Sequence, residues 1–236
     1  MWAICKKEFK TYFCSPVAYA FIAMVLFITG LFFWIYNLGR ASADFLSVLE
    51  ALNLIFIFTV PVLTMRLFSE ERKTRTDQLL LTAPVRLPAV VLGKYFAALL
   101  LFAIAVAATW VYPLILRILG QPDMAVIAGG YIGFIFLGAA MIAVGVLISA
   151  LTTSQITAAV STFAVILVLY MADAFAAGIP VKWLSSLVQA LSVFSRYNSF
   201  TIGVIGLSPV VYFLSVTALF LYLTVRVIRR RQIRGN

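Results

Sequence analysis

The side chains that could do chemistry gather in one polar stretch, residues 69–78, which carries both charge signs. Its acids Glu70, Glu71 and Asp77 are of the types that serve as general acids or as metal ligands. Each of them stands near Arg or Lys rather than in a cluster of ligating residues. The stretch therefore predicts charge pairing, and it indicates no catalytic or metal-ligating site.

The rest of the chain adds no catalytic motif. It has no histidine, and its two cysteines, Cys5 and Cys14, lack the second pair that a zinc site needs. It contains no G-x-x-x-x-G-K-[ST] loop for ATP, no H-E-x-x-H motif and no Ser-His-Asp set. We therefore predict that the chain is not an enzyme and binds no cofactor of its own.

The elements that must position the polar stretch are membrane-spanning helices. Of the 236 residues, 64% are hydrophobic and 11% are charged, whereas an ordinary soluble domain is about 45–50% apolar and about 25% charged. A soluble fold of this size could not bury so much apolar surface. Six stretches are long and apolar enough to span a bilayer, namely 17–38, 45–65, 89–116, 125–151, 156–176 and 209–227.

The net charge of +10 predicts how the chain is oriented. Six spans leave both termini on one side, and fourteen cations fall on that side: Lys6, Lys7, Lys10, Arg66, Arg72, Lys73, Arg75, Arg86, Lys94, Arg226, Arg229, Arg230, Arg231 and Arg234. The other four are Arg40, Arg117, Lys182 and Arg196. Because cytoplasmic loops carry the excess of Lys and Arg, both termini and the 66–94 loop are predicted to be cytoplasmic. Since no basic face interleaved with aromatic residues lies outside the membrane, we expect lipid contacts and no nucleic acid.

Two segments outside the spans are also predicted to be helical. In residues 1–15, Trp2, Cys5 and Phe9 recur at spacings of three and four with lysines between them, which is typical of an interfacial helix with its apolar stripe in lipid. Residues 178–208 mix apolar helical spacing with polar interruptions, which favours short re-entrant helices on the external side. Interrupted helices are tolerated at membrane depth where protein or water forms hydrogen bonds with their free backbone groups. Candidate exit-path residues there are Trp183, Arg196, Asn198 and Gly203.

The polar stretch itself allows two interpretations. It is followed directly by Leu79-Leu80-Leu81, a triplet that is too short to span a membrane and must bury against protein or the interface. A short helix with one polar and one apolar side would do this. On composition alone, a solvated connecting loop is the simpler interpretation. No row of charges crosses the spans, so an ion-coupled secondary transporter finds no support.

Residues 65–85, MRLFSEERKTRTDQLLLTAPV, resemble the signature M-R-x-x-x-E-E-(K/R)-x-x-G-T-x-E-L-L-L-T-x-P of ABC type-2 transporter permeases. In that family the signature follows a second span that carries a proline, here Pro61. Arg75 and Gln78 depart from the frequent Gly and Glu. Residues 6–19 and 194–205 resemble the family's entrance and its external re-entrant region, so the likeness covers essentially the whole chain. It is closest to the gliding-motility-type export permeases.

The resemblance implies an all-α polytopic membrane protein that forms one transmembrane domain, residues 1–236. Its parts would be six transmembrane helices, an N-terminal interfacial helix (1–15), a cytoplasmic coupling loop (66–88), an external re-entrant segment (178–208) and a basic cytoplasmic tail (228–236). The protein would lie in the bacterial inner membrane. In the family, the helix of the coupling loop sits in a groove on a separate ATPase. The coupling residues would be Glu70, Glu71, Arg72, Thr76, Leu79, Leu80, Thr82 and Pro84.

The same resemblance implies partners and a function. A cytoplasmic ABC ATPase dimer would bind ATP and Mg, and a second permease copy or a related permease would complete the translocation path. The chain would then be the membrane subunit of an ATP-driven exporter. The alternative is an ATPase-driven membrane scaffold, or mechanotransmission subunit, that translocates nothing. The motif does not separate these two functions, because both need coupling to the ATPase.

Overall fold

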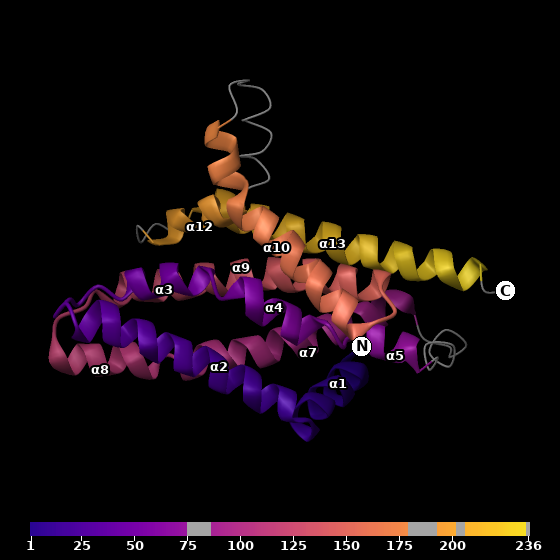
Figure 1. The fold of residues 1–236 in the computed structure, drawn as a ribbon, viewed down its shortest axis with the longest axis horizontal. Coiled ribbons are helices and arrows are strands. Elements are labelled where there is room, and N and C mark those ends of the chain that lie inside the picture. The colour runs from indigo at the N-terminus through magenta and orange to yellow at the C-terminus, as the bar shows by residue number, and fades with distance from the viewer. Residues whose placement is uncertain (75–85, 179–192, 202–205, 235–236) are drawn as a thin grey trace.

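The computed structural model describes residues 1–74, 86–178, 193–201 and 206–234, and these ranges contain helices and no strand. Most of the helices run along one long axis, which is horizontal in Figure 1. In chain order they are α1 (Trp2–Cys14), α2 (Pro16–Phe33), the π-helix η1 (Trp34–Leu38), α3 (Leu46–Asn53), α4 (Phe56–Thr64), α5 (Ser69–Lys73), α7 (Leu87–Ala108), α8 (Val111–Leu119), α9 (Met124–Leu151), α10 (Gln155–Gly178), α12 (Val193–Thr201) and α13 (Leu207–Arg234).

Six parts of the described chain match the predicted spans. Five are helices or continuous helix pairs that are long and apolar enough to cross a membrane: Pro16–Leu38, Leu87–Leu119, Met124–Leu151, Gln155–Ala172 and Leu207–Arg231. The sixth is the pair α3 and α4, which passes the same test when taken together. An all-α polytopic membrane protein is therefore confirmed.

The second span is not the continuous helix that residues 45–65 predict. Its halves, α3 and α4, meet at an angle of 57°. At the bend the chain tightens into turns, in which the N–H of Ile55 donates to the carbonyl of Leu52 at 2.9 Å and the N–H of Phe58 to that of Ile55 at 2.9 Å. These tighter i→i+3 bonds change the direction of the axis.

The third span also contains a break, between α7 and α8. Pro113 has no N–H to donate to the carbonyl of Thr109, four residues before it. That carbonyl instead accepts from the N–H of Tyr112 at 3.1 Å. Proline therefore accounts for the interruption, and the span continues to Leu119.

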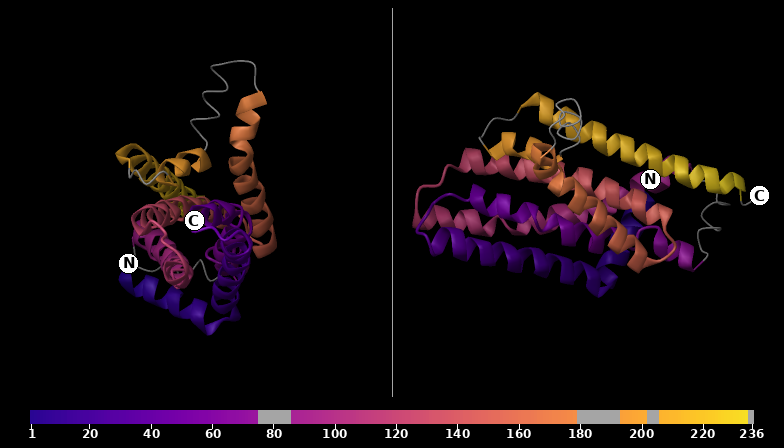
Figure 2. Two further views of the ribbon diagram at one scale, coloured as in Figure 1. Left: turned by 90° about the vertical axis from the view of Figure 1, so that its left-hand side faces the viewer. Right: turned by 45° about the horizontal axis from the view of Figure 1, so that its top comes forward.

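Helix α9 is the centre of the bundle. It begins at Asp123, whose carboxylate caps the helix by accepting from the N–H groups of Ala125 and Val126. It packs against α4, α7, α10, α12 and α13. Its membrane window is 67% buried, against 22% for α10 and 11% for α13. The last two helices are peripheral, and Figure 2 shows α10 leading away from the others.

The two ends of the bundle differ in content. Helices α1 and α5 and the last turns of α13 lie toward one end, which we call the terminal end. Helix η1, the start of α3 and α8 lie at the other, which we call the hairpin end (Figure 1). The helix predicted for residues 1–15 is present as α1. Its apolar stripe does not lie wholly in lipid, because Cys5 and Tyr12 are buried in the bundle and α1 packs on α7.

Two further predicted segments take a definite form. Within residues 178–208, helix α12 is present and buries Tyr197 and Phe200 against α9. Helix α13 does not end at residue 227, where the last span was predicted to finish. It continues without a break through the basic tail to Arg234.

Candidate functional site

The polar stretch begins at a sharp corner, residues 65–74, that follows α4. The chain turns through residues 65–68 and then forms the short helix α5. Glu70 and Glu71 occupy the first turn of α5, while Arg72 and Lys73 occupy its last turn. This order complements the helix dipole, with acids at the amino end and bases at the carboxyl end. The charge pattern of the sequence thus accounts for a helix here.

Lys94 lies inside α7, and its side chain is 2% exposed. Its ammonium group donates to the carbonyl of Leu67 at 2.7 Å, to Oε1 of Glu71 at 2.8 Å and to Oε1 of Glu8 at 3.1 Å. A lysine has three N–H donors, so all of them have partners. It also lies 5.2 Å from the centre of the Phe68 ring.

These contacts make one buried charge cluster out of three elements, with Glu8 from α1, Glu71 from α5 and Lys94 from α7. The two carboxylates are mostly buried, with exposed side-chain fractions of 15% and 20%. A buried charge is tolerated only when it is paired and hydrogen-bonded. The cluster therefore holds the corner in one position relative to α1 and α7.

A second tether joins α1 to the end of α4. The hydroxyl of Tyr12 donates to the carbonyl of Leu63 at 2.7 Å. Burial raises the pKa of the Tyr12 hydroxyl, the nearby carboxylate of Glu8 raises it further, and Arg66 opposes them. The hydroxyl therefore stays protonated and able to donate across the physiological pH range.

Helix α9 holds the corner from its other side. The hydroxyl oxygen of Ser149 accepts from the N–H groups of Phe68 at 3.1 Å and Ser69 at 3.4 Å. In the opposite direction, the guanidinium of Arg72 donates to the carbonyl of Thr152 at 2.7 Å and to that of Ala150 at 3.4 Å. The last carbonyls of a helix have no partner within it, so Arg72 satisfies groups that α9 leaves free.

The same carbonyls receive a cation from α13. Arg231 donates to the carbonyl of Ala150 and, at 3.1 Å, to that of Leu151. The carbonyl of Ala150 thus joins Arg72 of α5 to Arg231 of α13. The corner is connected in this way to α1, α7, α9 and α13, which come from four separate parts of the chain.

Close packing brings α1 near enough for these contacts. A Cβ atom added at Gly93 of α7 would lie 2.9 Å from Cγ2 of Ile4 and 3.1 Å from the carbonyl oxygen of Met1. Any larger residue would push α1 away from α7. The absence of a side chain at Gly93, next to Lys94, is therefore needed for Glu8 to reach the ammonium group.

The outer rim of the site is more exposed. Arg66 and Glu70 form a bidentate ion pair, with Nε to Oε2 at 2.8 Å and Nη2 to Oε1 at 3.1 Å. The bond from Arg66 lowers the pKa of Glu70, while burial opposes it. A small cavity of about 40 Å³ lies between this pair and α1, bordered also by Thr11 and Ser15.

The site is made of ion pairs and hydrogen bonds between helices. Within residues 1–74, 86–178, 193–201 and 206–234, no three His, Cys, Asp or Glu side chains gather closely enough to hold a metal ion. Every charged group of the cluster is already engaged by protein. What the geometry can do is transmit a displacement of the corner to the four helices that hold it.

Some predicted coupling residues lie at this site. Glu70, Glu71 and Arg72 belong to α5. Glu71 and Arg72 turn toward the bundle, to Lys94 and to carbonyls at the end of α9, whereas Glu70 pairs with Arg66 on the exposed rim. Thr76, Leu79, Leu80, Thr82 and Pro84 lie outside the described residues. Their role in coupling stays a prediction.

Most of the predicted exit-path residues have no described side chain. Trp183 and Gly203 lie outside the described residues, and Asn198 belongs to α12 without a described side chain. The guanidinium of Arg196, also in α12, lies 4.2 Å from the centre of the Tyr212 ring of α13. Among the described coupling residues, Glu70, Glu71 and Arg72 have other partners than Arg196, and the role of Arg196 in an exit path stays a prediction.

Sequence reasoning missed several residues of the site. Lys94, assigned above to the loop, lies inside α7 and is the centre of the cluster. Its signal was visible, because it is the one charged residue among the 22 of this apolar helix. Glu8, Ser149 and Arg231 carried no comparable signal, because their partners lie about 80 residues away along the chain.

Comparison with protein families agrees with this architecture. A family model described as ABC-2 family transporter protein matches residues 36–228, from η1 into the last turns of α13. A search of curated proteins gives no match. The matched range takes in the corner with Glu71 and Lys94 and well over half of the chain. The chain therefore belongs to the ABC-2 family of transporter proteins, as a multi-pass membrane permease subunit of an ABC system.

Proposed function

We propose that this chain is the membrane subunit of an ATP-driven exporter, which forms the translocation path and couples to a separate cytoplasmic ATPase. The observation that carries the proposal is the buried cluster of Lys94, Glu8 and Glu71. It fixes the base of the predicted coupling loop to the helices of the bundle. A loop meant only to connect two spans would not need such an anchor.

The terminal end is proposed to face the cytoplasm of a bacterial cell, across the inner membrane. Fourteen of the 18 cations are predicted for that side, which agrees with the excess of Lys and Arg in cytoplasmic loops. The corner and residues 75–85 would then face the compartment that holds ATP. The ATPase dimer would bind ATP and Mg itself, and this chain would hydrolyse nothing.

Coupling would work through rigid contacts. When the ATPase subunits close on ATP, they would push the segment after α5, and the corner would move with it. Because Lys94, Ser149 and Arg72 connect the corner to α7 and α9, the displacement would reach the centre of the bundle. A rigid-body rocking of packed helices is a common form of such a switch.

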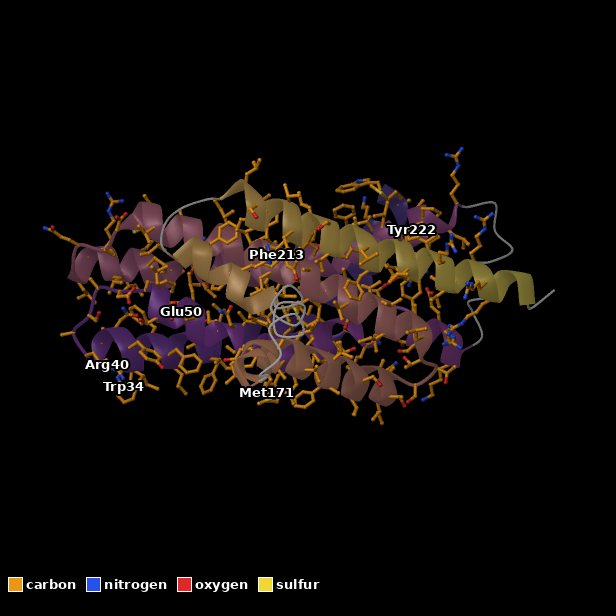
Figure 3. All side chains as sticks on the ribbon, turned by 90° about the horizontal axis from the view of Figure 1, so that it is seen from above. Trp34, Arg40, Glu50, Met171, Phe213 and Tyr222 are labelled. Atoms are coloured by element: carbon orange, nitrogen blue, oxygen red, sulfur yellow. The ribbon has the colours of Figure 1, made fainter. Side chains whose placement is uncertain are left out.

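One chain supplies half of a pathway in this proposal. The broken second span and the exposed apolar side chains of α10, including Val160, Val168 and Met171, supply surface for a second permease copy or a related permease. Figure 3 shows Met171 at the edge of the molecule. The kind of export would be that of the gliding-motility-type permeases, which residues 6–19 and 65–85 resemble.

The experiment co-expresses the full chain with its ATPase and purifies the complex. Leu79→Asp with Leu80→Asp should remove the apolar anchor and lower co-purification of the ATPase at least tenfold. The matched control is Ile118→Asp with Leu119→Asp, two exposed apolar residues at the hairpin end, and it should leave co-purification unchanged. Equal recovery of the ATPase with both variants would contradict the coupling assignment.

A second readout separates an exporter from a membrane scaffold. Inside-out vesicles that contain the complex would be incubated with cell extract, with or without ATP, and their contents compared by mass spectrometry. An exporter should accumulate at least one compound only with ATP. If ATP is hydrolysed and nothing accumulates, the scaffold function replaces the exporter.

A further inference from the structure

Helix α13 presents one long face to its surroundings. It has 28 residues, and its membrane window is only 11% buried. Its exposed apolar side chains Leu219, Tyr222 and Leu223 come just before the first arginine of the tail. Exposed side chains of this kind in a membrane span have lipid tails or another protein as neighbours.

A basic groove continues that face toward the terminal end. It has a volume of about 300 Å³ and is lined by Tyr222, Val225, Arg226, Arg229 and Arg230. These positions are spaced by three and four residues, so they share one side of the helix. Figure 3 shows Tyr222 in the half of α13 that leads to the terminal end.

Among the described residues, no carboxylate compensates the charge of the groove. Its lining includes three arginines and no acid. In the part of the chain that the structure describes, the ion pairs join Arg66 to Glu70 and Lys94 to Glu8 and Glu71, and none involves a groove arginine. Arg226 donates instead to the hydroxyl of Tyr222 at 3.0 Å. A ligand with negative charge would complete the groove.

The contacts of Arg231 fix which side of α13 faces outward. It points to the opposite side of the helix and donates to the carbonyls of Ala150 and Leu151 at the end of α9. This contact holds the last turns of α13 against the bundle. Because the helix cannot rotate freely, Arg226, Arg229 and Arg230 stay on the exposed side.

We propose that this groove is a binding site for the phosphate headgroup of an anionic phospholipid in the leaflet at the terminal end. Guanidinium groups bind phosphate oxygens in a planar, bidentate manner. Tyrosine is favoured at the level of the headgroups, and the apolar face that includes Leu219 and Leu223 would pack along the acyl chain. The inference stands apart from ATPase coupling, since it uses none of the residues of the corner.

The test reconstitutes the full chain in phosphatidylcholine vesicles that contain spin-labelled phosphatidylglycerol or spin-labelled phosphatidylcholine. Electron paramagnetic resonance then gives the relative association of each lipid with the protein. Each cation near an anionic lipid surface changes association about fivefold. The R226Q/R229Q/R230Q variant should therefore lower the preference for phosphatidylglycerol by at least about fivefold.

The chain provides a matched control at the hairpin end. Arg40 lies over the ring of Tyr36, four residues before it, as Arg226 lies over Tyr222, but it has no neighbouring arginines. R40Q should keep the preference for phosphatidylglycerol. A loss per removed arginine that is as large in R40Q as in the triple variant would mean that net charge alone attracts the lipid, which would overturn the proposed site.

Three further measurements control for misfolding and for other ligands of the groove. R226K/R229K/R230K should keep most of the preference, and its loss there and in the Gln variant alike would overturn a site based on charge. Inorganic phosphate should not displace the lipid, whereas displacement would show that a free anion occupies the groove. Addition of the ATPase should leave the lipid bound, and its release would assign the groove to the ATPase interface instead.

Discussion

The two ends of the bundle are held together in different ways. At the terminal end, polar contacts join residues that are far apart in sequence, such as Lys94 with Glu8 and Ser149 with Phe68. At the hairpin end the contacts that hold the turn after η1 are local, although the hydroxyl of Tyr112 in α8 also donates to the carbonyl of Leu26 in α2 at 2.8 Å. The amide of Asn37 donates to the carbonyls of Ser42 and Asp44, each at 2.9 Å.

The two kinds of bond have different effects: local bonds shape a loop, and long-range bonds connect helices. Local bonds fix the path of one turn and do not transmit its displacement to other helices. Long-range bonds make several helices move as one body. The terminal end, where α1, α5, α7 and α9 share such bonds, is therefore better able to pass on displacement than the hairpin end, where the bonds of Asn37 shape one turn. The variants below test that contrast, in order of decreasing expected effect.

Lys94→Met should have the largest effect. It leaves the carboxylates of Glu8 and Glu71 buried beside an apolar side chain, and breaking a buried ion pair by removing one partner costs about 3–5 kcal/mol. Denaturant unfolding of the solubilised protein measures the loss. Lys73→Met, which changes an exposed lysine of the same corner, should change stability by less than about 0.5 kcal/mol. Similar losses in both variants would show that the cluster does not hold the corner.

Gly93→Ala should detach α1 partly from α7. The added methyl group would meet Ile4 and the backbone of Met1, and overpacking of this kind costs about 1–3 kcal/mol. In a Cys14→Ser background, the buried Cys5 should react faster with a maleimide. The control is Gly120→Ala at the hairpin end, where the nearest atom would be 3.6 Å away. If Cys5 reactivity does not rise in Gly93→Ala, the close approach is not needed.

Asn37→Ala tests the hairpin end by itself. It removes two hydrogen bonds from a side chain that is 2% exposed, and each contributes about 0.5–1.5 kcal/mol. Stability should fall by about 1–2 kcal/mol, while ATPase co-purification and coupled hydrolysis stay at the level of the unchanged protein. Loss of coupling from this variant would contradict the contrast between the ends.

Glu70→Gln should have the smallest effect, and one that depends on pH. Arg66 lowers the pKa of Glu70 below its ordinary value of 4.5. The pair therefore contributes stability above about pH 4.5, and the contribution is lost as the pH falls through the lowered pKa. Because the Glu70 side chain is 41% exposed, the contribution should stay below about 1 kcal/mol. The difference in melting temperature between the two proteins should shrink below that pH, and a constant difference would contradict the pairing.

Much of the fold could be predicted from the sequence, because long apolar stretches indicate which segments lie in the membrane. The predicted spans 125–151 and 156–176 agree with α9 and α10 to within about two residues. The bend between α3 and α4 could not be predicted in this way. A hydropathy window averages over about 20 residues, and Leu54 and Ile55 at the bend are as apolar as their neighbours.

The site was less predictable than the spans. Charge order and motif located the corner, since Glu70, Glu71 and Arg72 stand together in sequence. The partner of Glu71 could not be found in the same way, because Lys94 is 23 residues further along and Glu8 is 86 residues before Lys94. The packing of α1 on α7 brings Glu8 to Lys94, and the corner after α4 brings Glu71 to it.

The uninterrupted length of α13 has a mechanical consequence. A helix of 28 residues is about 42 Å long, which exceeds the hydrocarbon core of about 30 Å. As a stiff rod of this length, it reaches beyond the hydrocarbon core. A tilt of about 10° about one end would sweep the other through about 7 Å, on the scale of one helical turn. Small rotations among the packed helices would thus appear, amplified, where Arg231 meets the end of α9.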